Sequence, residues 1–207
     1  AFSLTLGNVE TVIGNQSADT LTLEATQTFG EMDLKSGSDM LILYNGTNTL
    51  TLANIETIIG NGGGDTVVLE AGLSGLINLG GGSDSLTLAN GDNTITLGNV
   101  ETVTGNANTD ILVLESALTQ GIWNLGGGSD SLVLAGADNT LTLGNVESVT
   151  GNATTGNDQI VLMAAQTLGV VDLMAGAGDR LTLSSAGTNT LTVANTETLV
   201  GGTAVDV

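Results

Sequence analysis

The 207-residue sequence has no cysteine, histidine or proline, and its only basic residues are Lys35 and Arg180, against 22 acidic ones. Without cysteine or histidine the chain lacks thiolate and imidazole chemistry and the usual ligands of zinc and haem. It also has no disulfide that would indicate a cellular compartment. The formal net charge of −20 argues against nucleic acid and anionic membranes as partners, because both are bound by basic surfaces.

Long apolar segments are missing as well. The longest apolar run, Ile160–Ala165, is far shorter than the roughly 20 residues that cross a bilayer as a helix. We therefore expect no membrane insertion. The hydrophobic content of 41% is nevertheless too high for a disordered acidic tail, so a folded chain is expected.

Glycine (31 residues) and internal repetition are what the chain has instead. The stretch from Leu79 to Glu115 returns with small changes from Leu125 to Leu162. Its second half returns again at 48–70 and 189–202, and the opening residues 3–24 repeat the same pattern. Self-similarity of this kind indicates one supersecondary unit repeated along the chain.

The phrase aspartate–x–apolar–x–apolar marks the period of this repeat. Its aspartates are Asp19, Asp39, Asp65, Asp84, Asp110, Asp130, Asp158 and Asp179. Successive members are alternately 19–21 and 26–28 residues apart, so two steps make a unit of 45–49 residues. We expect a single array over residues 1–207, with units at about 1–18 (partial), 19–64, 65–109, 110–157 and 158–205.

Short strands are predicted throughout each unit. Leu, Ile and Val alternate with Thr, Ser and Asn, which is the period of a strand with one buried face. Besides the two strands that follow aspartate, the short step holds one further strand and the long step holds two. No stretch carries a helical period long enough for a confident helix.

Strands this short cannot build a core singly, but stacked copies can bury a continuous ladder of leucines. The sequence therefore predicts an all-β fold, a parallel β-solenoid (β-helix or β-roll) of about nine stacked rungs. With one coil per aspartate-to-aspartate step, each unit makes two unequal coils. Two alternatives remain open: a flatter roll with a strand every nine residues or so, and a single wide coil per unit.

The pieces GGGSDSLTL, GGGSDSLVL and AGAGDRLTL resemble the glycine-rich aspartate nonapeptide of the repeats-in-toxin (hemolysin-type calcium-binding) family. The corner NVETVTGN is similar to a phrase of long repetitive bacterial surface proteins. This resemblance implies a calcium-stabilised solenoid that is extracellular, at the cell surface. It also implies that the eight aspartates named above, Asp19 to Asp179, are the Ca²⁺ ligands.

Electrostatics independently raises the question of what balances the negative charge of these aspartates. Carboxylates stacked one per rung would lie about 5 Å apart, and each pair would repel by roughly 3–4 kcal/mol at a protein surface. The neutraliser could be Ca²⁺, a proton, or N–H donors of the turns. The second acidic series is expected to be solvated or to bond its own corner; it comprises Glu10, Glu56, Glu101, Glu147 and Glu197. The corner asparagines are expected to share amide hydrogen bonds from rung to rung.

For function, the sequence favours a structural extracellular rod in a bacterial adhesin, surface layer or self-assembling filament. Because the repeats start and stop part-way through a unit, we expect end-to-end self-association or continuation of the same array. No enzyme is expected, since acid–base catalysis needs two different carboxyl environments and the ladders repeat one. The alternative is a carbohydrate- or ice-binding module, suggested by the Thr-x-Thr pairs at 49/51, 94/96, 140/142 and 190/192.

Overall fold

The computed structural model describes the backbone of residues 1–207 and every side chain except that of Leu168. Over the described residues all regular secondary structure is strand, which confirms the all-β prediction. No helix in this part of the chain is long and apolar enough to cross a membrane. The strands are β1 (Ser3–Leu6), β2 (Thr11–Asn15), β3 (Thr20–Leu23), β4 (Gly30–Lys35), β5 (Met40–Ile42), β6 (Thr49–Ala53), β7 (Thr57–Gly62), β8 (Thr66–Leu69), β9 (Ser74–Gly81), β10 (Ser85–Thr87), β11 (Asn93–Gly98), β12 (Thr102–Asn106), β13 (Asp110–Leu114), β14 (Gly121–Gly126), β15 (Ser131–Val133), β16 (Thr140–Gly144), β17 (Ser148–Thr150), β18 (Gln159–Leu162), β19 (Thr167–Asp172), β20 (Arg180–Thr182), β21 (Thr190–Ala194) and β22 (Thr198–Val200).

The alternation in the sequence is reproduced in the burial of the side chains. In β6, Leu50 and Leu52 are buried, whereas Thr49 and Thr51 are partly exposed. The same inward Leu and outward Thr recur in β3 and β16. A period of two follows from the pleat of a strand, so each strand contributes one apolar face to the core.

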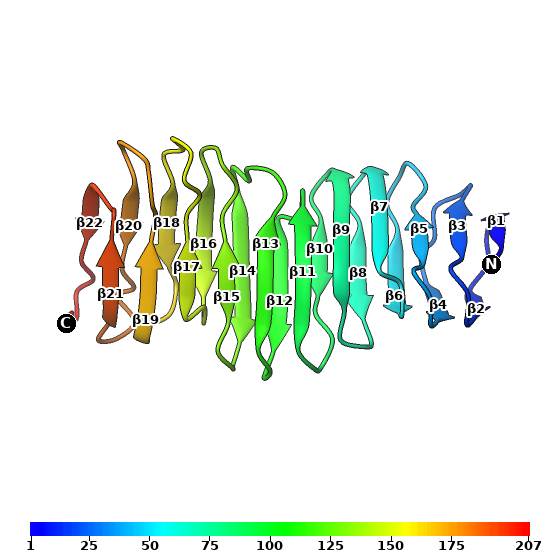
Figure 1. The fold of residues 1–207 in the computed structure, drawn as a ribbon, viewed down its shortest axis with the longest axis horizontal. Coiled ribbons are helices and arrows are strands. Elements are labelled where there is room, and N and C mark those ends of the chain that lie inside the picture. Colours follow the sequence, from blue (N-terminus) through cyan, green and yellow to red (C-terminus); the bar gives the residue numbers. More distant parts are fainter. The chain divides into compact units, whose positions relative to one another are not determined.

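Every described strand pairing is parallel, and strands alternate between two sheets along the chain. We call the sheet of odd-numbered strands the odd sheet and the other the even sheet. In Figure 1 the odd strands run in one direction and the even strands in the other, as in a solenoid with two strands per coil. The structure therefore confirms the predicted parallel β-solenoid, and its roughly ten turns agree with the expected nine rungs.

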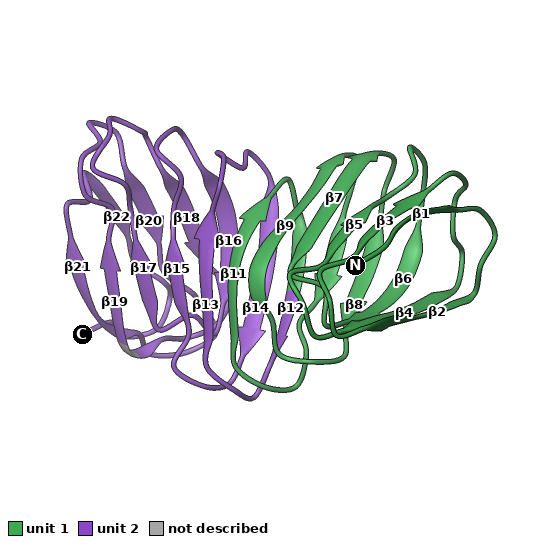
Figure 2. Cartoon of the chain, turned by 45° about the vertical axis from the view of Figure 1, so that its right-hand side comes forward, with its two compact units in different colours: residues 1–103 green, residues 104–207 purple. Residues whose placement is uncertain are grey.

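The chain divides into two compact units, residues 1–103 and 104–207, coloured separately in Figure 2. In unit 1 the odd sheet has the order β1-β3-β5-β7-β9-β11 and the even sheet the order β2-β4-β6-β8-β10. In unit 2 the orders are β13-β15-β17-β19-β21 and β14-β16-β18-β20-β22, and β12 straddles the boundary.

The core of each unit is a ladder of like residues. In the odd sheet of unit 1, Leu21 pairs with Leu41, Leu41 with Ile58, and Ile58 with Ile77, and all four side chains are fully buried. Each buried aliphatic side chain of this kind stabilises the fold by roughly 1.5–3 kcal/mol. The single tryptophan, Trp123 in β14, is also fully buried, so it belongs to the core of unit 2.

The coil differs from the expectation in one respect. Each complete repeat contains five strands: β3–β7, β8–β12, β13–β17 and β18–β22. Paired strands are offset by 17–23 residues, as in Thr49↔Thr66 and Thr167↔Thr190. A repeat therefore makes two and a half coils, and the expectation of one coil per aspartate step, two unequal coils per repeat, is wrong. The alternative with a strand every nine residues or so describes the observed coil.

An odd number of strands per repeat has a direct geometric consequence. Equivalent strands of successive repeats fall in alternate sheets: β3 lies in the odd sheet and β8 in the even sheet. In unit 2 the same holds for β13 and β18. Each repeat is thus turned by half a coil relative to the one before it, and its surface features change side.

Candidate functional site

The eight predicted aspartates are all buried, with exposed fractions of 0–3%. Each lies at the turn that enters a strand, as the sequence indicated. They do not form one row, however, because the half-coil rotation places them in pairs on two sides. Within unit 1, Asp19 and Asp39 enter odd strands, whereas Asp65 and Asp84 enter even strands. The carboxylates therefore do not stack one per rung along the array, as considered from the sequence.

The aspartates belong to hydrogen-bonded stacks that run from coil to coil. In the even sheet of unit 1 the backbone N–H of Asn48 donates to Oδ1 of Asp65 at 2.8 Å. The N–H of Asp65 donates to Oδ1 of Asp84 at 2.6 Å, and that of Asp84 to Oε2 of Glu101 at 2.8 Å. The pattern Asn–Asp–Asp–Glu recurs in unit 2 as Asn139, Asp158, Asp179 and Glu197. We call each such series an Asn–Asp–Asp–Glu stack.

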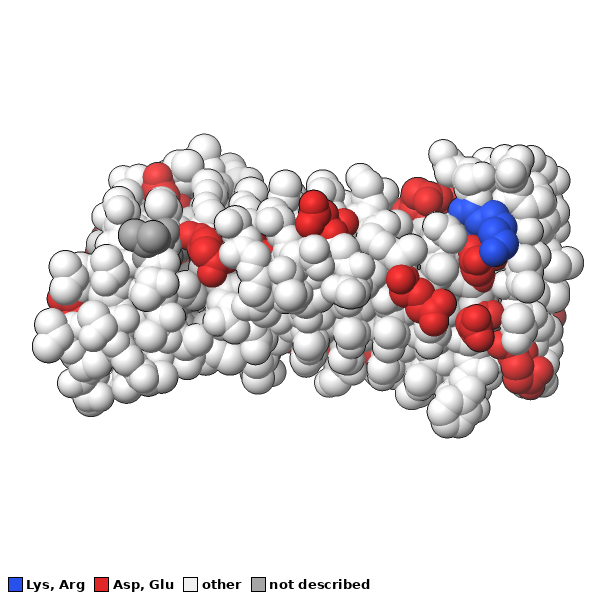
Figure 3. Space-filling model, turned by 90° about the horizontal axis from the view of Figure 1, so that it is seen from below, with Lys and Arg blue, Asp and Glu red and all other residues white. Residues whose placement is uncertain are grey.

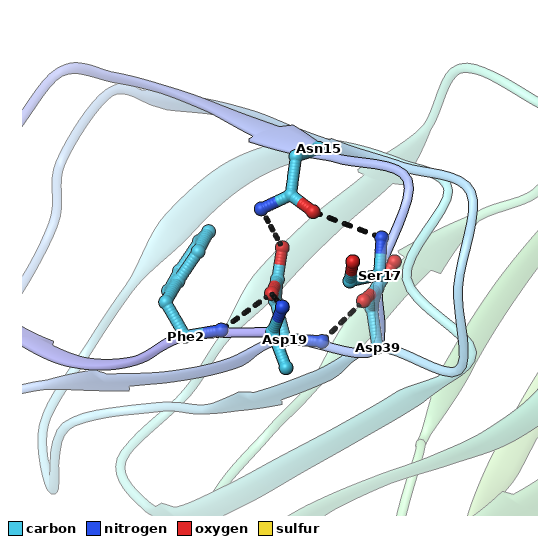
Figure 4. Close-up of polar contacts among 6 residues, drawn as sticks. Phe2, Asn15, Ser17, Asp19 and Asp39 are labelled. Atoms are coloured by element: carbon cyan, nitrogen blue, oxygen red, sulfur yellow. Dashed lines mark hydrogen bonds and ion pairs between the residues drawn. The ribbon is translucent and has the colours of Figure 1, made fainter.

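The odd sheets carry the same chemistry. Figure 4 shows the first turn, in which the N–H of Phe2 donates to Oδ1 of Asp19 at 2.7 Å, and the N–H of Asp19 donates to Asp39 at 2.7 Å. Asn15 donates its side-chain amide to Oδ2 of Asp19 at 3.1 Å. The stack ends when the N–H of Asp39 donates to Glu56. In unit 2, Asp110, Asp130 and Glu147 repeat this series.

The glutamates of the Asn-x-Glu corner terminate these stacks. Glu56, Glu101, Glu147 and Glu197 each accept the N–H of the aspartate one coil earlier. These four glutamates therefore bond the aspartate turn of the preceding coil, and the expectation that each would bond its own corner is wrong. The asparagine before each glutamate has a positive φ of 48–54°, the left-handed conformation that asparagine tolerates.

The stack asparagines close their own turns. Nδ2 of Asn139 donates to the carbonyls of Ala135 and Ala137 and to Oδ1 of Asp158, while its Oδ1 accepts the N–H of Leu118. Asn48 makes the corresponding bonds. The expected amide hydrogen bonds between asparagines of successive coils form at two other corners, where Asn99 donates to Oδ1 of Asn78 at 2.9 Å and Asn145 donates to Oδ1 of Asn124 at 2.7 Å. The asparagines at the stack positions do not form one continuous ladder, because those of neighbouring repeats enter strands of opposite sheets.

Not all carboxylate oxygens in the stacks are satisfied. Oδ2 is buried and has no hydrogen-bond partner in Asp39, Asp65, Asp84, Asp130 and Asp179. Loss of hydration, reinforced by repulsion from Glu101 and Asp65, raises the pKa of Asp84 to about 6. The same causes, with Glu147 and Asp110 as the repelling groups, raise the pKa of Asp130 to about 6. Burial also raises the pKa of Asp39, Asp65 and Asp158.

Whether these residues suit calcium depends on the oxygen atoms that they can offer as ligands. Oxygen-only ligands suit Ca²⁺, which takes six to eight of them. Oδ1 of Asp65, Asp84 and Asp158 accepts the N–H of the preceding coil. Among the described side chains, no group of three or more Asp, Glu, His or Cys is placed to hold a metal ion. The stacks thus do not form a multi-carboxylate cage, and calcium binding stays a prediction.

The outer faces show where the remaining candidates lie. Thr49 and Thr51 belong to the even sheet, whereas Thr94 and Thr96 belong to the odd sheet of the same unit. The Thr-x-Thr pairs therefore do not stack into one flat array, which removes the regular surface expected of an ice-binding face. Figure 3 shows acidic side chains scattered over the view and one small basic patch. Lys35 pairs with Asp33, and Arg180 is exposed.

Two structural features were not anticipated from the sequence. Gly60 lies against the backbone of the next coil, where an added Cβ would meet the carbonyl oxygen of Leu79 at 2.1 Å. Gln27 and Gln166 are buried, and neither Nε2 has a hydrogen-bond partner. Aligning the repeats indicates the burial of these two glutamines, because the other two complete repeats have Leu73 and Leu118 at the same position.

The architecture defines the chain as a parallel β-solenoid built from five-strand repeats. Comparison with known proteins finds no matching family model, no similar curated protein and no similar solved structure. The resemblance to the repeats-in-toxin family therefore rests on the glycine-rich aspartate turns and the solenoid fold.

Proposed function

We propose that the chain is a structural, non-catalytic repeat array of the bacterial cell surface, part of an adhesin, surface layer or self-assembling filament. The observation that supports this proposal is that the buried polar groups form hydrogen bonds between successive coils. Asp65, Asp84 and Asp158 each join one coil to the next through a backbone N–H. Such groups hold the coil stack together and are withdrawn from solvent.

The acidic residues support a structural role over a catalytic one. A catalytic pair needs two carboxyl groups in distinct environments, both accessible to substrate. Asp84 and Asp130 occupy matching environments, and both are about 1% exposed. Hydrogen bonds that join successive coils in a regular stack, in contrast, require the same environment at each repeat.

The outermost strands support association with a further array. Leu4 in β1 is 44% exposed and Leu199 in β22 is 53% exposed, whereas Leu50 and Ile58, at the corresponding positions of another repeat, are buried. Unpaired edges of parallel strands accept another strand through backbone hydrogen bonds. The partner we propose is a second copy of this array or its continuation.

Light scattering over a range of protein concentrations tests this proposal. The purified 207-residue chain is expected to form species larger than a monomer at high concentration, and Leu199→Lys is expected to weaken the association. Thr87→Lys, on the partly exposed face of β10, serves as a matched control for added charge. A strictly monomeric chain at every concentration, with and without calcium, contradicts the proposal.

Calcium stabilisation is a separate part of the proposal. Circular dichroism during calcium titration against a chelator tests it, with a rise in β-structure or thermal midpoint as the expected result. A spectrum and midpoint that are indifferent to the chelator would remove calcium from the proposal and leave the self-association part intact.

A further inference from the structure

The outer face of the even sheet in unit 1 carries a pocket with a volume of about 310 Å³. One aromatic ring, two threonines and three carboxylates line it, and these belong to Phe29, Thr49, Thr51, Glu10, Glu31 and Glu70. The Phe29 side chain is 82% exposed, and the three glutamates are exposed as well. We call this hollow the Phe29 pocket.

The register of the even sheet spreads the lining of the Phe29 pocket over several strands. Glu31 in β4 pairs with Thr51 in β6, and both side chains lie on the outer face. Glu10 immediately precedes β2, and Glu70 immediately follows β8. The four strands β2, β4, β6 and β8 are neighbours, so the lining extends roughly 14 Å across the sheet at a spacing of about 4.8 Å per strand.

This spread favours an extended ligand over a single ion. Among the described side chains, no three carboxyl groups are placed to hold one metal ion. The glutamates of the Phe29 pocket therefore present separate hydrogen-bond acceptors along the sheet.

The same hollow recurs in unit 2. A pocket of about 240 Å³ there is lined by Val170, Thr190 and Thr192. In the first complete repeat the corresponding positions are those of Glu31, Thr49 and Thr51. The fold of a repeat thus produces the hollow, and the side chains around it decide what it can bind.

The first complete repeat differs from the others in these side chains. At the position of Glu31 the other three complete repeats have the apolar residues Leu76, Ile122 and Val170. At the position of Phe29 the third complete repeat has Gln120. Phe29 and Glu31 are exposed and add nothing to the core. An exposed aromatic ring beside a pocket with a few polar side chains is the arrangement of a small-ligand site.

The chemistry of the lining indicates a neutral sugar chain as the ligand. Carboxylates accept hydrogen bonds and threonine hydroxyls both donate and accept them, which matches the hydroxyl groups of a sugar. The Phe29 ring offers a flat apolar face to the C–H groups of a sugar ring. Three carboxylates would repel an anionic polysaccharide. A cationic ligand would gain little from them, because charges this exposed are screened by salt.

We propose that the Phe29 pocket binds a neutral polysaccharide, one sugar ring of which stacks on Phe29 while sugar hydroxyl groups bond Glu31 and Thr51. The proposal does not depend on self-association, which uses the backbone edges of the outermost strands.

Affinity electrophoresis of the full 207-residue chain, in native gels that contain dextran, mannan or laminarin, tests the proposal. At least one of these neutral polysaccharides should retard the chain. Titration calorimetry with that polysaccharide should give the same affinity at about 0.1 M and 1 M salt, because no charge pairing is involved.

Substitutions at the pocket identify the binding groups. Phe29→Ala should weaken binding about tenfold or more, whereas Phe29→Tyr, which keeps the ring, should retain it. Glu31→Leu, which introduces the residue of the second complete repeat, should weaken binding about fivefold. Ile122→Ala shortens an exposed apolar side chain at the equivalent position of another repeat, and this matched control should leave the affinity unchanged.

Circular dichroism checks that each variant is folded, as expected for substitutions of exposed side chains. Light scattering of Phe29→Ala should match that of the unaltered chain, so a failure of self-association is recognised separately. The proposal is overturned if none of the three polysaccharides binds the unaltered chain, or if folded Phe29→Ala binds as tightly. Binding to immobilised poly-lysine alone, or an affinity that falls steeply with salt, also overturns it, since either would reveal a surface for cations.

Discussion

Replacing Gln27 by leucine should stabilise the protein. The Gln27 side chain is 4% exposed, and its Nε2 is buried without a hydrogen-bond partner. Leu73 and Leu118, at the corresponding positions of two other repeats, are 6% exposed and belong to the core. The backbone N–H of Gln27 donates to Asn48 and is unaffected by the substitution.

The magnitude follows from the unsatisfied donor. Leaving a buried amide unbonded costs about 1–3 kcal/mol, and leucine of similar volume removes that cost and adds apolar burial. We expect Gln27→Leu to raise the free energy of unfolding by about 2 kcal/mol, or the thermal midpoint by roughly 4–8 °C. Thermal and urea unfolding measure the change.

The reverse exchange is the matched control. Leu118→Gln, in the same position of another repeat, should lower the free energy of unfolding by a similar amount. If Gln27→Leu leaves stability unchanged or lowers it while Leu118→Gln is neutral, the inferred equivalence of the two positions is wrong.

Two further substitutions test the close approach and the backbone conformation of the coils. Gly60→Ala should destabilise the chain by about 3 kcal/mol in urea unfolding, since the new Cβ would meet the Leu79 carbonyl oxygen at 2.1 Å. The control Gly127→Ala should be nearly neutral, because the nearest atom to its added Cβ is 3.8 Å away. Met174→Gly should raise the thermal midpoint by the equivalent of about 1 kcal/mol. Met174 has a φ of 65°, and the corresponding residue of another repeat, Gly126, has a φ of 95°. An unchanged midpoint would mean that this turn carries no strain.

Local pattern was enough to identify the strands and the residues of the stacks. Alternation of Leu with Thr predicted β6 and β16, and the repeat of Asp and Asn-x-Glu marked Asp84 and Glu101 as recurring acidic positions. These signals are local, since they depend on pleat and turn chemistry. The bonding partner of each group was not local, because Asp84 and Glu101 are 17 residues apart and meet only through the coil.

The sequence by itself determined that this chain is an all-β repeat array with apolar residues inside and acids at the turns. The sequence also predicted the five strands of each repeat. How those pieces close into coils was decided by the tertiary structure, because the length of a coil depends on which strands pair across the sheets. Two strands per coil and five per repeat turn each repeat by half a coil. That rotation divides the aspartates between two sides and places Asp65, Asp84 and Glu101 in one hydrogen-bonded stack.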